Sequence, residues 1–260
     1  MDLGLEDYLQ GKVDIFSDCT EASFVSLYET FAQELAQREW IDFDTLPSDK
    51  VKEFRANFSG WQKKYLALRE FQANKAFDIK SAGLERTAYK ALPDEFSRNS
   101  YNRVEDLTEF VYYSACRKVV MVGCGPLPAT LLWLSDHHPD ASYIGLDIDN
   151  ECVRAASNLF GHLGRRNVTF QLLDGKDYNY QDVDFVYVAN HVSPKKNVLE
   201  TISATAGFGM QIVVREPTRT GRLFSEAVMD DLPNGFDICS IGSDSTEFFS
   251  YNLNLVWKGT

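Results

Sequence analysis

The sequence is poor in several features, and each shortage excludes a class of protein. Its 260 residues include five cysteines, an odd number, and no two of them have C-x-x-C spacing. We therefore expect neither a disulfide framework nor a zinc site, and we expect a reducing compartment. No run of 18 apolar residues is present, and residues 1–6 lack the basic and apolar stretches of a secretory leader. These shortages predict a cytoplasmic protein without a membrane partner.

Positive charge is also in short supply. Lysine and arginine together number 26, against 38 aspartates and glutamates, so the net charge at pH 7 is −12. A field of this sign repels nucleic acid backbones and anionic surfaces, and we expect no nucleic-acid partner. Hydrophobic residues make up 44% of the chain and aromatic residues 13%, which predicts a packed core and favours a small-molecule partner.

The first part of the chain has the periodicity of helices. Apolar side chains recur at spacings of three and four between Glu21 and Trp40, and again after Ser48, a candidate N-cap. They are Phe24, Tyr28, Phe31 and Leu35 in the first segment and Trp61, Tyr65 and Leu68 in the second. We interpret these side chains as core packing. The pattern resumes over residues 101–115, and we predict a helical N-terminal domain over residues 1–115 that acts as a substrate lid.

After Arg117 short apolar runs alternate with helical segments. The runs are Val119–Val122, Tyr143–Leu146, Val168–Leu172, Phe185–Ala189 and Gln211–Val214. Such alternation indicates βαβ units and a parallel sheet with right-handed crossovers. Residues 249–257 alternate between apolar and polar, which predicts a late, half-buried strand with residues 236–240 beside it. The fold class is therefore α/β, with a Rossmann-like domain over residues 116–260.

Glycine and aspartate stand where a parallel sheet binds ligands, at the carboxyl ends of its strands. Gly123 and Gly125 follow the first strand and allow close backbone approach. Asp147 ends the second strand, where it can accept hydrogen bonds from ribose hydroxyls, and Asp174 follows the third, near an adenine amino group. A dinucleotide loop has a third glycine where this chain has Pro128, whose missing N–H matters little to a ligand without phosphate. These features predict S-adenosylmethionine as the cofactor.

The glycine loop also resembles a known family. The string Gly123-x-Gly125-Pro126-Leu127-Pro128 is similar to nicotianamine synthases and to the bacterial opine-metallophore synthases of the staphylopine and pseudopaline types. Further segments resemble this family in order: Asp147-Ile148-Asp149, Ala189 with Ser193 to Lys196, Arg215, and Gly221-Arg222. The resemblance implies an S-adenosylmethionine-dependent transferase domain behind a helical domain. The residues expected at the cofactor are Gly123, Gly125, Pro126, Leu127, Asp147, Ile148, Asp174, Ala189 and Asn190.

The family transfers the 3-amino-3-carboxypropyl (α-aminobutyrate) group to an amine and releases methylthioadenosine. The resemblance implies that Glu70 accepts the amine proton or holds the amine, and that Tyr101 orients the nucleophile. A solvated helix charge and a core ring are the alternative interpretations of these two residues. His191 is expected at the acceptor, unless it is only a solvated loop residue.

Arginines and histidines complete the set of candidates. Arg215 and Arg222 are expected to bind carboxylates; the alternative is an ion pair with Glu216 or a surface acid. We interpret Lys195 and Lys196 as solvated. We expect no metal site, because His137 and His138 lack the i, i+4 spacing of a helical metal pair.

The acceptor implied by likeness to the pseudopaline type is L-histidine. The product would serve metal acquisition as an intermediate of an opine metallophore, with a reductive opine dehydrogenase downstream. A single or a repeated transfer and a homodimer remain open. The alternatives are a small-molecule methyltransferase and a non-catalytic S-adenosylmethionine sensor. The by-product separates aminobutyrate transfer from methyl transfer, because the first yields methylthioadenosine and the second yields S-adenosylhomocysteine.

Overall fold

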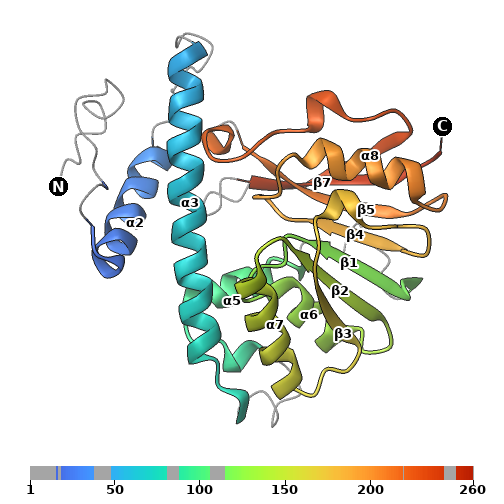
Figure 1. Cartoon of the computed structure of the whole chain (residues 1–260), viewed down its shortest axis with the longest axis horizontal. Helices are drawn as coiled ribbons and strands as arrows, with labels where there is room; N and C mark the ends of the chain where they lie inside the picture. The colour runs from blue at the N-terminus through green and yellow to red at the C-terminus, as the bar shows by residue number, and fades with distance from the viewer. Residues whose placement is uncertain are drawn as a thin grey trace.

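The computed structural model places a layer of helices beside a sheet (Figure 1). It describes residue 16 and residues 19–37, 48–80, 88–105, 115–218, 220–242 and 250–259. The helices are α2 (Glu21–Gln37), α3 (Ser48–Ala76), α5 (Glu95–Asn102), α6 (Ala129–His137), α7 (Asn150–His162) and α8 (Lys195–Thr205). Short 3₁₀ turns are η1 (Tyr89–Ala91), η4 (Gly175–Asp177), η5 (Thr220–Leu223) and η6 (Met229–Asp231). The strands are β1 (Lys118–Val122), β2 (Ser142–Asp147), β3 (Val168–Leu172), β4 (Phe185–Val188), β5 (Gln211–Pro217), β6 (Phe236–Ile241) and β7 (Ser250–Trp257).

The described strands form one mixed sheet in the order β3-β2-β1-β4-β5-β7-β6. The strands β1 to β5 pair in parallel, whereas β7 pairs antiparallel with both β5 and β6. Each predicted apolar run forms its parallel strand, and the runs of β1, β4 and β5 are almost wholly buried. This is the Rossmann-like, methyltransferase-type arrangement, so the predicted α/β fold class is confirmed.

Helices cover both faces of this sheet. The helices α5, α6 and α7 pack on the face that carries Val119 and Met121, and α8 packs on the face that carries Val120 and Val122. Successive side chains of a strand point to opposite faces, so the short β1 run contributes to two cores. Among the described helices, none is long and apolar enough to cross a membrane.

The helices α2 and α3 share an aromatic core, as the spacing of their rings predicts. Its buried members are Phe16, Phe24, Tyr28, Phe31, Leu35, Phe58 and Phe224. In Figure 1 α3 stands between α2 and the sheet. Phe224 belongs to the segment after β5, and its ring centre lies 5.8 Å from that of Phe58. The cluster therefore also joins α3 to the sheet layer.

All described elements before residue 115 are helical, and the domain boundary at residues 115/116 stays a prediction. Within residues 101–115, where the helical pattern resumes, Tyr101 and Asn102 belong to α5, which ends at Asn102. Residues 106–114 of that segment lie outside the described residues.

The prediction that the last strand is half-buried is wrong. Ser250, Asn252 and Asn254 are buried, as Leu253 and Leu255 are, because β7 lies between β5 and β6 inside the sheet. Arg215 donates to Asn252 Oδ1 and to Ser250 Oγ, each at 2.6 Å, and Asn254 Nδ2 donates to Ser240 Oγ at 2.9 Å. The polar side chains of the alternating pattern are thus hydrogen-bonded inside the molecule.

Candidate functional site

The loop after β1 requires glycine at two positions, because the backbone there is left-handed and neighbouring atoms leave no room for a Cβ. Gly123 and Gly125 have φ angles of 75° and 67°, in the left-handed region. A Cβ at Gly123 would lie 2.8 Å from Val192 Cγ2, and a Cβ at Gly125 would lie 2.5 Å from Glu70 Oε2. The second of these contacts brings a carboxylate of α3 directly against the loop.

A cavity of about 390 Å³ opens between this loop, α3 and the carboxyl ends of the parallel strands. It collects most of the site residues predicted from the sequence. They are Glu70, Gly123, Gly125, Pro126, Leu127, Asp147, Ile148, Asp174, Ala189, Asn190, His191 and Arg215. The cavity therefore lies where ligands bind in open α/β sheets.

Two acids at strand ends shape the cavity. Asp147 accepts from the amide of Gly125 at 2.9 Å and from the amide of Asp149 at 3.0 Å, which holds the glycine loop to the end of β2. Asp174 accepts from the amide of Lys176 and forms an ion pair with its ammonium at 3.0 Å. Desolvation opposes ionisation of Asp174, but these contacts with Lys176 outweigh it and lower the Asp174 pKa. Asp174 therefore presents a charged carboxylate at the rim.

Glu70 lines the cavity from α3. Burial and, to a lesser degree, the charge of Asp147 raise the pKa of Glu70, Arg103 opposes them, and the result is a pKa of about 8. A carboxyl group with this pKa exchanges a proton near neutral pH. Glu70 is therefore not the solvated helix charge that was the alternative interpretation.

Asn74 is a site residue that the sequence did not reveal. Its Nδ2 donates to Pro126 O at 2.6 Å and to Ala155 O at 3.4 Å, so α3 is bound both to the glycine loop and to α7. Asn74 lies one turn after Glu70, and this spacing is the signal that would have found it. Asn74 therefore holds the loop next to the place where Glu70 approaches Gly125.

A second cavity, of about 350 Å³, adjoins the first. Lys63, Asn190, His191, Val192 and Ser193 line both cavities. The second cavity is completed by Lys52, Arg55, Ala56 and Ser59 of α3 and by Phe224, Ser225 and Glu226. The two cavities therefore meet at the segment that follows β4.

His191 stands at this junction in its neutral form. Burial, followed by the charges of Lys195 and Lys63, lowers the pKa of His191 to about 3. Its Nδ1 lies 3.3 Å from Ser225 Oγ. The interpretation of His191 as a merely solvated loop residue is wrong.

The two predicted arginines have different surroundings. Arg215 lines the first cavity, where it is buried and bound to Asn252 and Ser250. Its expected alternative partner, Glu216, instead accepts from the amides of Val228 and Met229. Arg215 thus brings a positive charge to the cavity wall, where Asn252 and Ser250 accept its hydrogen bonds.

Arg222 does not reach either cavity. Its Nη2 lies 3.1 Å from Asp230 Oδ2, a surface ion pair, and its carbonyl accepts from Arg55 Nε. The structure therefore does not bring Arg222 to the predicted carboxylate-binding position, because the turn η5 directs it towards Asp230. The ion-pair alternative holds for this residue.

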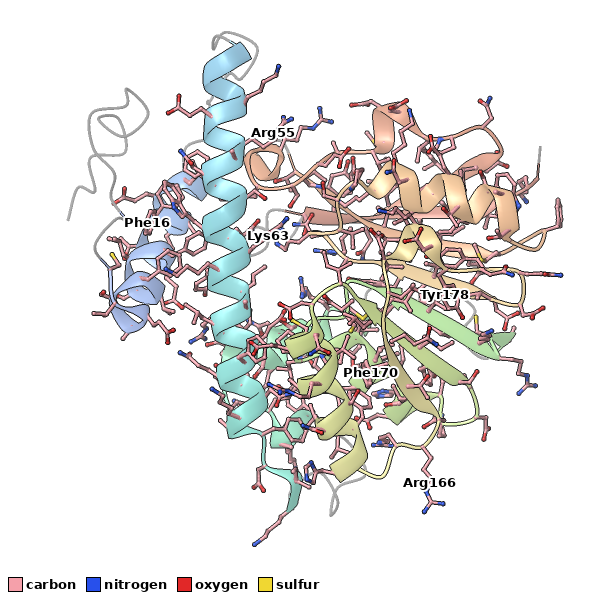
Figure 2. All side chains as sticks on the ribbon, in the orientation of Figure 1. Phe16, Arg55, Lys63, Arg166, Phe170 and Tyr178 are labelled. Carbon is pink, nitrogen blue, oxygen red and sulfur yellow. The ribbon has the colours of Figure 1, made fainter. Side chains whose placement is uncertain are left out.

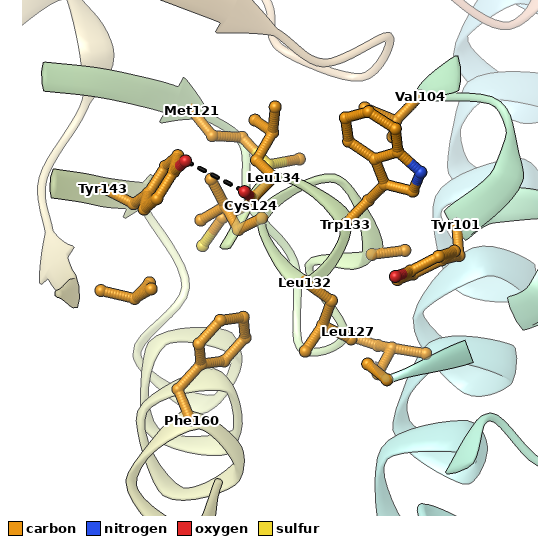
Figure 3. Close-up of a cluster of buried hydrophobic side chains, with 14 of the residues drawn as sticks. Tyr101, Val104, Met121, Cys124, Leu127, Leu132, Trp133, Leu134, Tyr143 and Phe160 are labelled. Atoms are coloured by element: carbon orange, nitrogen blue, oxygen red, sulfur yellow. Dashed lines mark hydrogen bonds between the residues drawn. The ribbon is translucent and has the colours of Figure 1, made fainter. Parts of the chain in front are cut away.

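Tyr101 lies outside both cavities as well. It is buried in the core between α5 and α6, beside Trp133 and Leu132 (Figure 3). Its hydroxyl donates to Asp136 Oδ2 at 2.7 Å. The structure does not bring Tyr101 to the reacting centre, because α5 turns this ring towards α6; Phe96, Ser100 and Arg103 are the residues near it that line the cavity.

The interpretation of Lys195 as solvated is wrong. Its side chain is buried, and its Nζ donates to Glu226 O at 2.7 Å. Burial and the charge of Arg215 lower the pKa of Lys195, Glu216 and Glu226 oppose them, and the result is a pKa of about 8. Lys196 lies nearer the surface and pairs with Asp231. The described part of the chain contains no cluster of three or more side chains that could hold a metal ion.

Comparisons with known proteins find a matching family model and similar solved structures. A family model described as nicotianamine synthase protein matches residues 34–251. A search of curated protein sequences finds no match. The structure is similar to that of MtNAS, as a glutamate-to-glutamine variant in complex with S-adenosylmethionine, with a TM-score of 0.70 and 18% identity over 98% of this chain and 95% of that chain.

Two further solved structures have the same fold. MtNAS in complex with MTA and tNA has a TM-score of 0.71 and 17% identity over 98% of this chain and 95% of that chain. A SAM-dependent methyltransferase from Aquifex aeolicus has a TM-score of 0.52 and 18% identity over 70% of this chain and 99% of that chain. The similarity to MtNAS extends over the helical layer as well, whereas the similarity to the methyltransferase covers less of the chain.

Proposed function

The chain belongs to the nicotianamine synthase family, and on this premise we propose that it transfers the 3-amino-3-carboxypropyl group of S-adenosylmethionine to the amine of an amino acid. One observation carries the proposal. The carboxylate of Glu70, with a pKa near 8, lies against Gly125 in the cavity at the strand ends. A transfer to an amine needs a base at this position, since the amine loses a proton as it forms the new bond.

The residues around the first cavity suit S-adenosylmethionine. Asp147 and Asp174 supply acceptors for the ribose and adenine, and the exposed Ile148 offers an apolar surface at the rim. Pro128, with no N–H, is the N-cap of α6, so the loop is poorly suited to a pyrophosphate. MtNAS, which has this fold, is crystallised with S-adenosylmethionine and with MTA. These features support S-adenosylmethionine as the co-substrate.

The reaction balances with groups present in the cavity. The amine nitrogen attacks the γ-carbon of the aminobutyrate group, the bond from that carbon to sulfur breaks, and the sulfur keeps the electron pair as a neutral thioether. Glu70 takes the amine proton. Because the leaving group is neutral, the protein's main contribution is to align the amine with one of the three carbons on the sulfonium.

For the acceptor we put L-histidine first, as a step in the biosynthesis of a pseudopaline-like opine metallophore. The support is the overall likeness of the sequence to that branch, and no single residue carries it. The pathway would then need a reductive opine dehydrogenase that condenses the product with an α-keto acid.

Product analysis tests the reaction. The purified protein is incubated with S-adenosylmethionine and a panel of amino acids, and the products are identified by mass spectrometry. We expect methylthioadenosine and an acceptor that has gained one aminobutyrate, with histidine as the best acceptor. S-Adenosylhomocysteine as the by-product would contradict the proposal and indicate a methyltransferase. Binding of the co-substrate without turnover on any amino acid would indicate a sensor.

The role of Glu70 gives a second readout. Since Glu70 must be ionised to take a proton, we expect kcat/KM for the acceptor to rise with pH, with a midpoint near 8. Glu70→Gln should lower kcat by about 10²–10⁴-fold and remove this dependence. Glu53→Gln, at an exposed position of the same helix outside both cavities, is the control. A Glu70→Gln enzyme with wild-type turnover and pH profile would exclude Glu70 as the base.

A further inference from the structure

Two segments that follow neighbouring strands face each other at the junction of the two cavities. Asn190, His191 and Ser193 follow β4 and line both cavities. Ser225 and Glu226 come after β5 and line the second cavity. His191 Nδ1 lies 3.3 Å from Ser225 Oγ, and Ser193 Oγ donates to Glu226 Oε2 at 3.1 Å. The relative position of these two segments therefore sets the shape of the wall around His191.

Lys195 joins the same two segments from the protein interior. It is the first residue of α8, its side chain is 0% exposed, and its Nζ donates to Glu226 O at 2.7 Å. The side chain and the backbone of Glu226 are thus both bound to residues that follow β4. We call the hydrogen bonds of Ser193 and Lys195 to Glu226 the clasp.

The place of Lys195 is unfavourable for a cation. Complete burial takes the water away from its ammonium, and the N-terminus of a helix carries a partial positive charge of its own. Burial and the charge of Arg215 outweigh two nearby glutamates, so the pKa of Lys195 falls to about 8. An apolar side chain would suit this position better if stability were its only role. A buried charge at such a place indicates a functional constraint.

The bond of Lys195 does not require its charge. Among the described residues, the hydrogen bond of its Nζ goes to a carbonyl, and none goes to a carboxylate. An ammonium and a neutral amine both donate N–H, so the clasp holds in either protonation state. It therefore stays closed over the pH range in which Glu70 titrates.

The helix α3 holds the segment after β5 from its other side. Arg55 Nε donates to Arg222 O at 3.0 Å, and Phe224 packs against Phe58. Figure 2 shows Arg55 on the side of α3 that faces the sheet. Residues 222–226 thus connect the helix that carries the proposed base with the segment that follows β4. The clasp therefore restrains the distance between the two.

We propose that Lys195 is a positioning residue: through the clasp it fixes His191 and the wall around it relative to Glu70, and so keeps the reacting groups aligned. This inference rests on the proposed function, because alignment of the amine with one carbon of the sulfonium is the protein's main contribution to that reaction. Lys195 lines neither cavity, so it acts through the residues that it holds.

Lys195→Met tests the positioning role, since methionine fills a similar volume without a donor. We expect kcat to fall by about 10–100-fold, because a small displacement of the wall misaligns the reactants. The Kd of methylthioadenosine, measured by calorimetry, should stay within about twofold, because its expected contacts are at Asp147 and Asp174 on other strand ends. Hydrogen exchange of the amides of residues 224–229 should become faster. The melting temperature should change by only about 3 °C, since a hydrogen bond and a buried charge are lost together.

Lys196→Met is the matched control. It makes the same substitution at the next residue of α8, whose side chain is 40% exposed and pairs with Asp231 at 2.7 Å. An exposed pair contributes little, so kcat and hydrogen exchange should stay within about twofold of wild type. Ser193→Ala is an independent variant that removes the other bond of the clasp without disturbing the interior. We expect it to lower kcat by about threefold or more.

Three results would overturn the inference. The first is a wild-type kcat in Lys195→Met, or a fall in kcat that Lys196→Met reproduces. The second is a loss of methylthioadenosine binding in Lys195→Met as large as the loss of kcat, which would indicate a general structural role. The third decides the matter if Lys195→Met does not fold: wild-type kcat and hydrogen exchange in Ser193→Ala. Failure of the proposed function would appear separately, as S-adenosylhomocysteine in the product assay.

Discussion

The contact between Gly125 and Glu70 is the residue-scale feature on which the site depends. Gly125 sits in a loop whose glycines are visible in the sequence, and Glu70 lies 55 positions earlier on α3. The Gly125 amide donates to Asp147, and the Glu70 carboxylate occupies the space that a Cβ at Gly125 would need. The glycine is therefore required by its backbone angle and by the acid it accommodates.

Gly125→Ala tests this requirement. A left-handed alanine costs roughly 1–2 kcal/mol, and its Cβ would push Glu70 out of place, so we expect lower stability and lower turnover. Gly60→Ala is the control, because Gly60 lies within α3 and a Cβ there meets nothing within 4 Å. That change should stabilise the protein by up to about 1 kcal/mol, since alanine favours helices. Urea unfolding measures the stability of both variants. Equal changes in stability at Gly125 and Gly60 would contradict a specific requirement for glycine at Gly125.

At the scale of elements, Asp136 of α6 joins several segments. It accepts from the Tyr101 hydroxyl of α5 and from the amide of Ala88 at 2.6 Å, and it forms an ion pair with Arg165, which follows α7. Tyr143 of β2 donates to Leu134 O at 3.0 Å nearby, as Figure 3 shows. These bonds hold α5 and α6 in place next to the glycine loop. The side chains of Asp136, Tyr101 and Tyr143 therefore have a structural role.

Tyr101→Phe distinguishes this structural role from a catalytic one. The change leaves the ring in the core and removes the hydroxyl that donates a hydrogen bond to Asp136. We expect a loss of about 1 kcal/mol in unfolding free energy with kcat and KM within twofold of wild type. Thermal unfolding and steady-state kinetics are measured on the same preparation. A large fall in kcat at unchanged stability would contradict the structural role and indicate that Tyr101 acts in catalysis.

For the whole molecule, function depends on how the helical layer docks on the sheet layer. The helix α3 carries Glu70 and one wall of both cavities, and the aromatic cluster that it shares with α2 includes Phe224 from beyond β5. Glu216 of β5 binds the amides of Val228 and Met229 and holds the end of that segment. The site is complete only when this docking is intact.

Phe224→Ala tests the docking. The side chain is buried against Phe58, so we expect a loss of about 3–5 kcal/mol in stability. The KM for S-adenosylmethionine should rise as well, because α3 then holds Glu70 less firmly. Phe208→Ala is the same substitution at a side chain that is 79% exposed, and its effect should stay within about 0.5 kcal/mol. Chemical denaturation gives the stabilities; similar losses at both positions would contradict the proposed docking.

The sequence by itself determined the parallel strands, the glycine loop and the two acids at strand ends. These are local properties, because a buried run, a tight turn and the residue after a strand are read from neighbouring positions. The aromatic spacing likewise predicted which face of α2 is buried, and the same reasoning gave the order of the strands along the chain.

Only the tertiary structure decided which charged and polar side chains reach the cavities. Glu70, Lys63 and Gln62 lie at the site because one face of α3 packs across loops more than fifty residues away. The same packing turned Tyr101 into the core and left Arg222 on the surface. Sequence spacing shows which residues share a helix face, but long-range packing sets what that face meets, and here it put Glu70 and Lys63 at the same cavity.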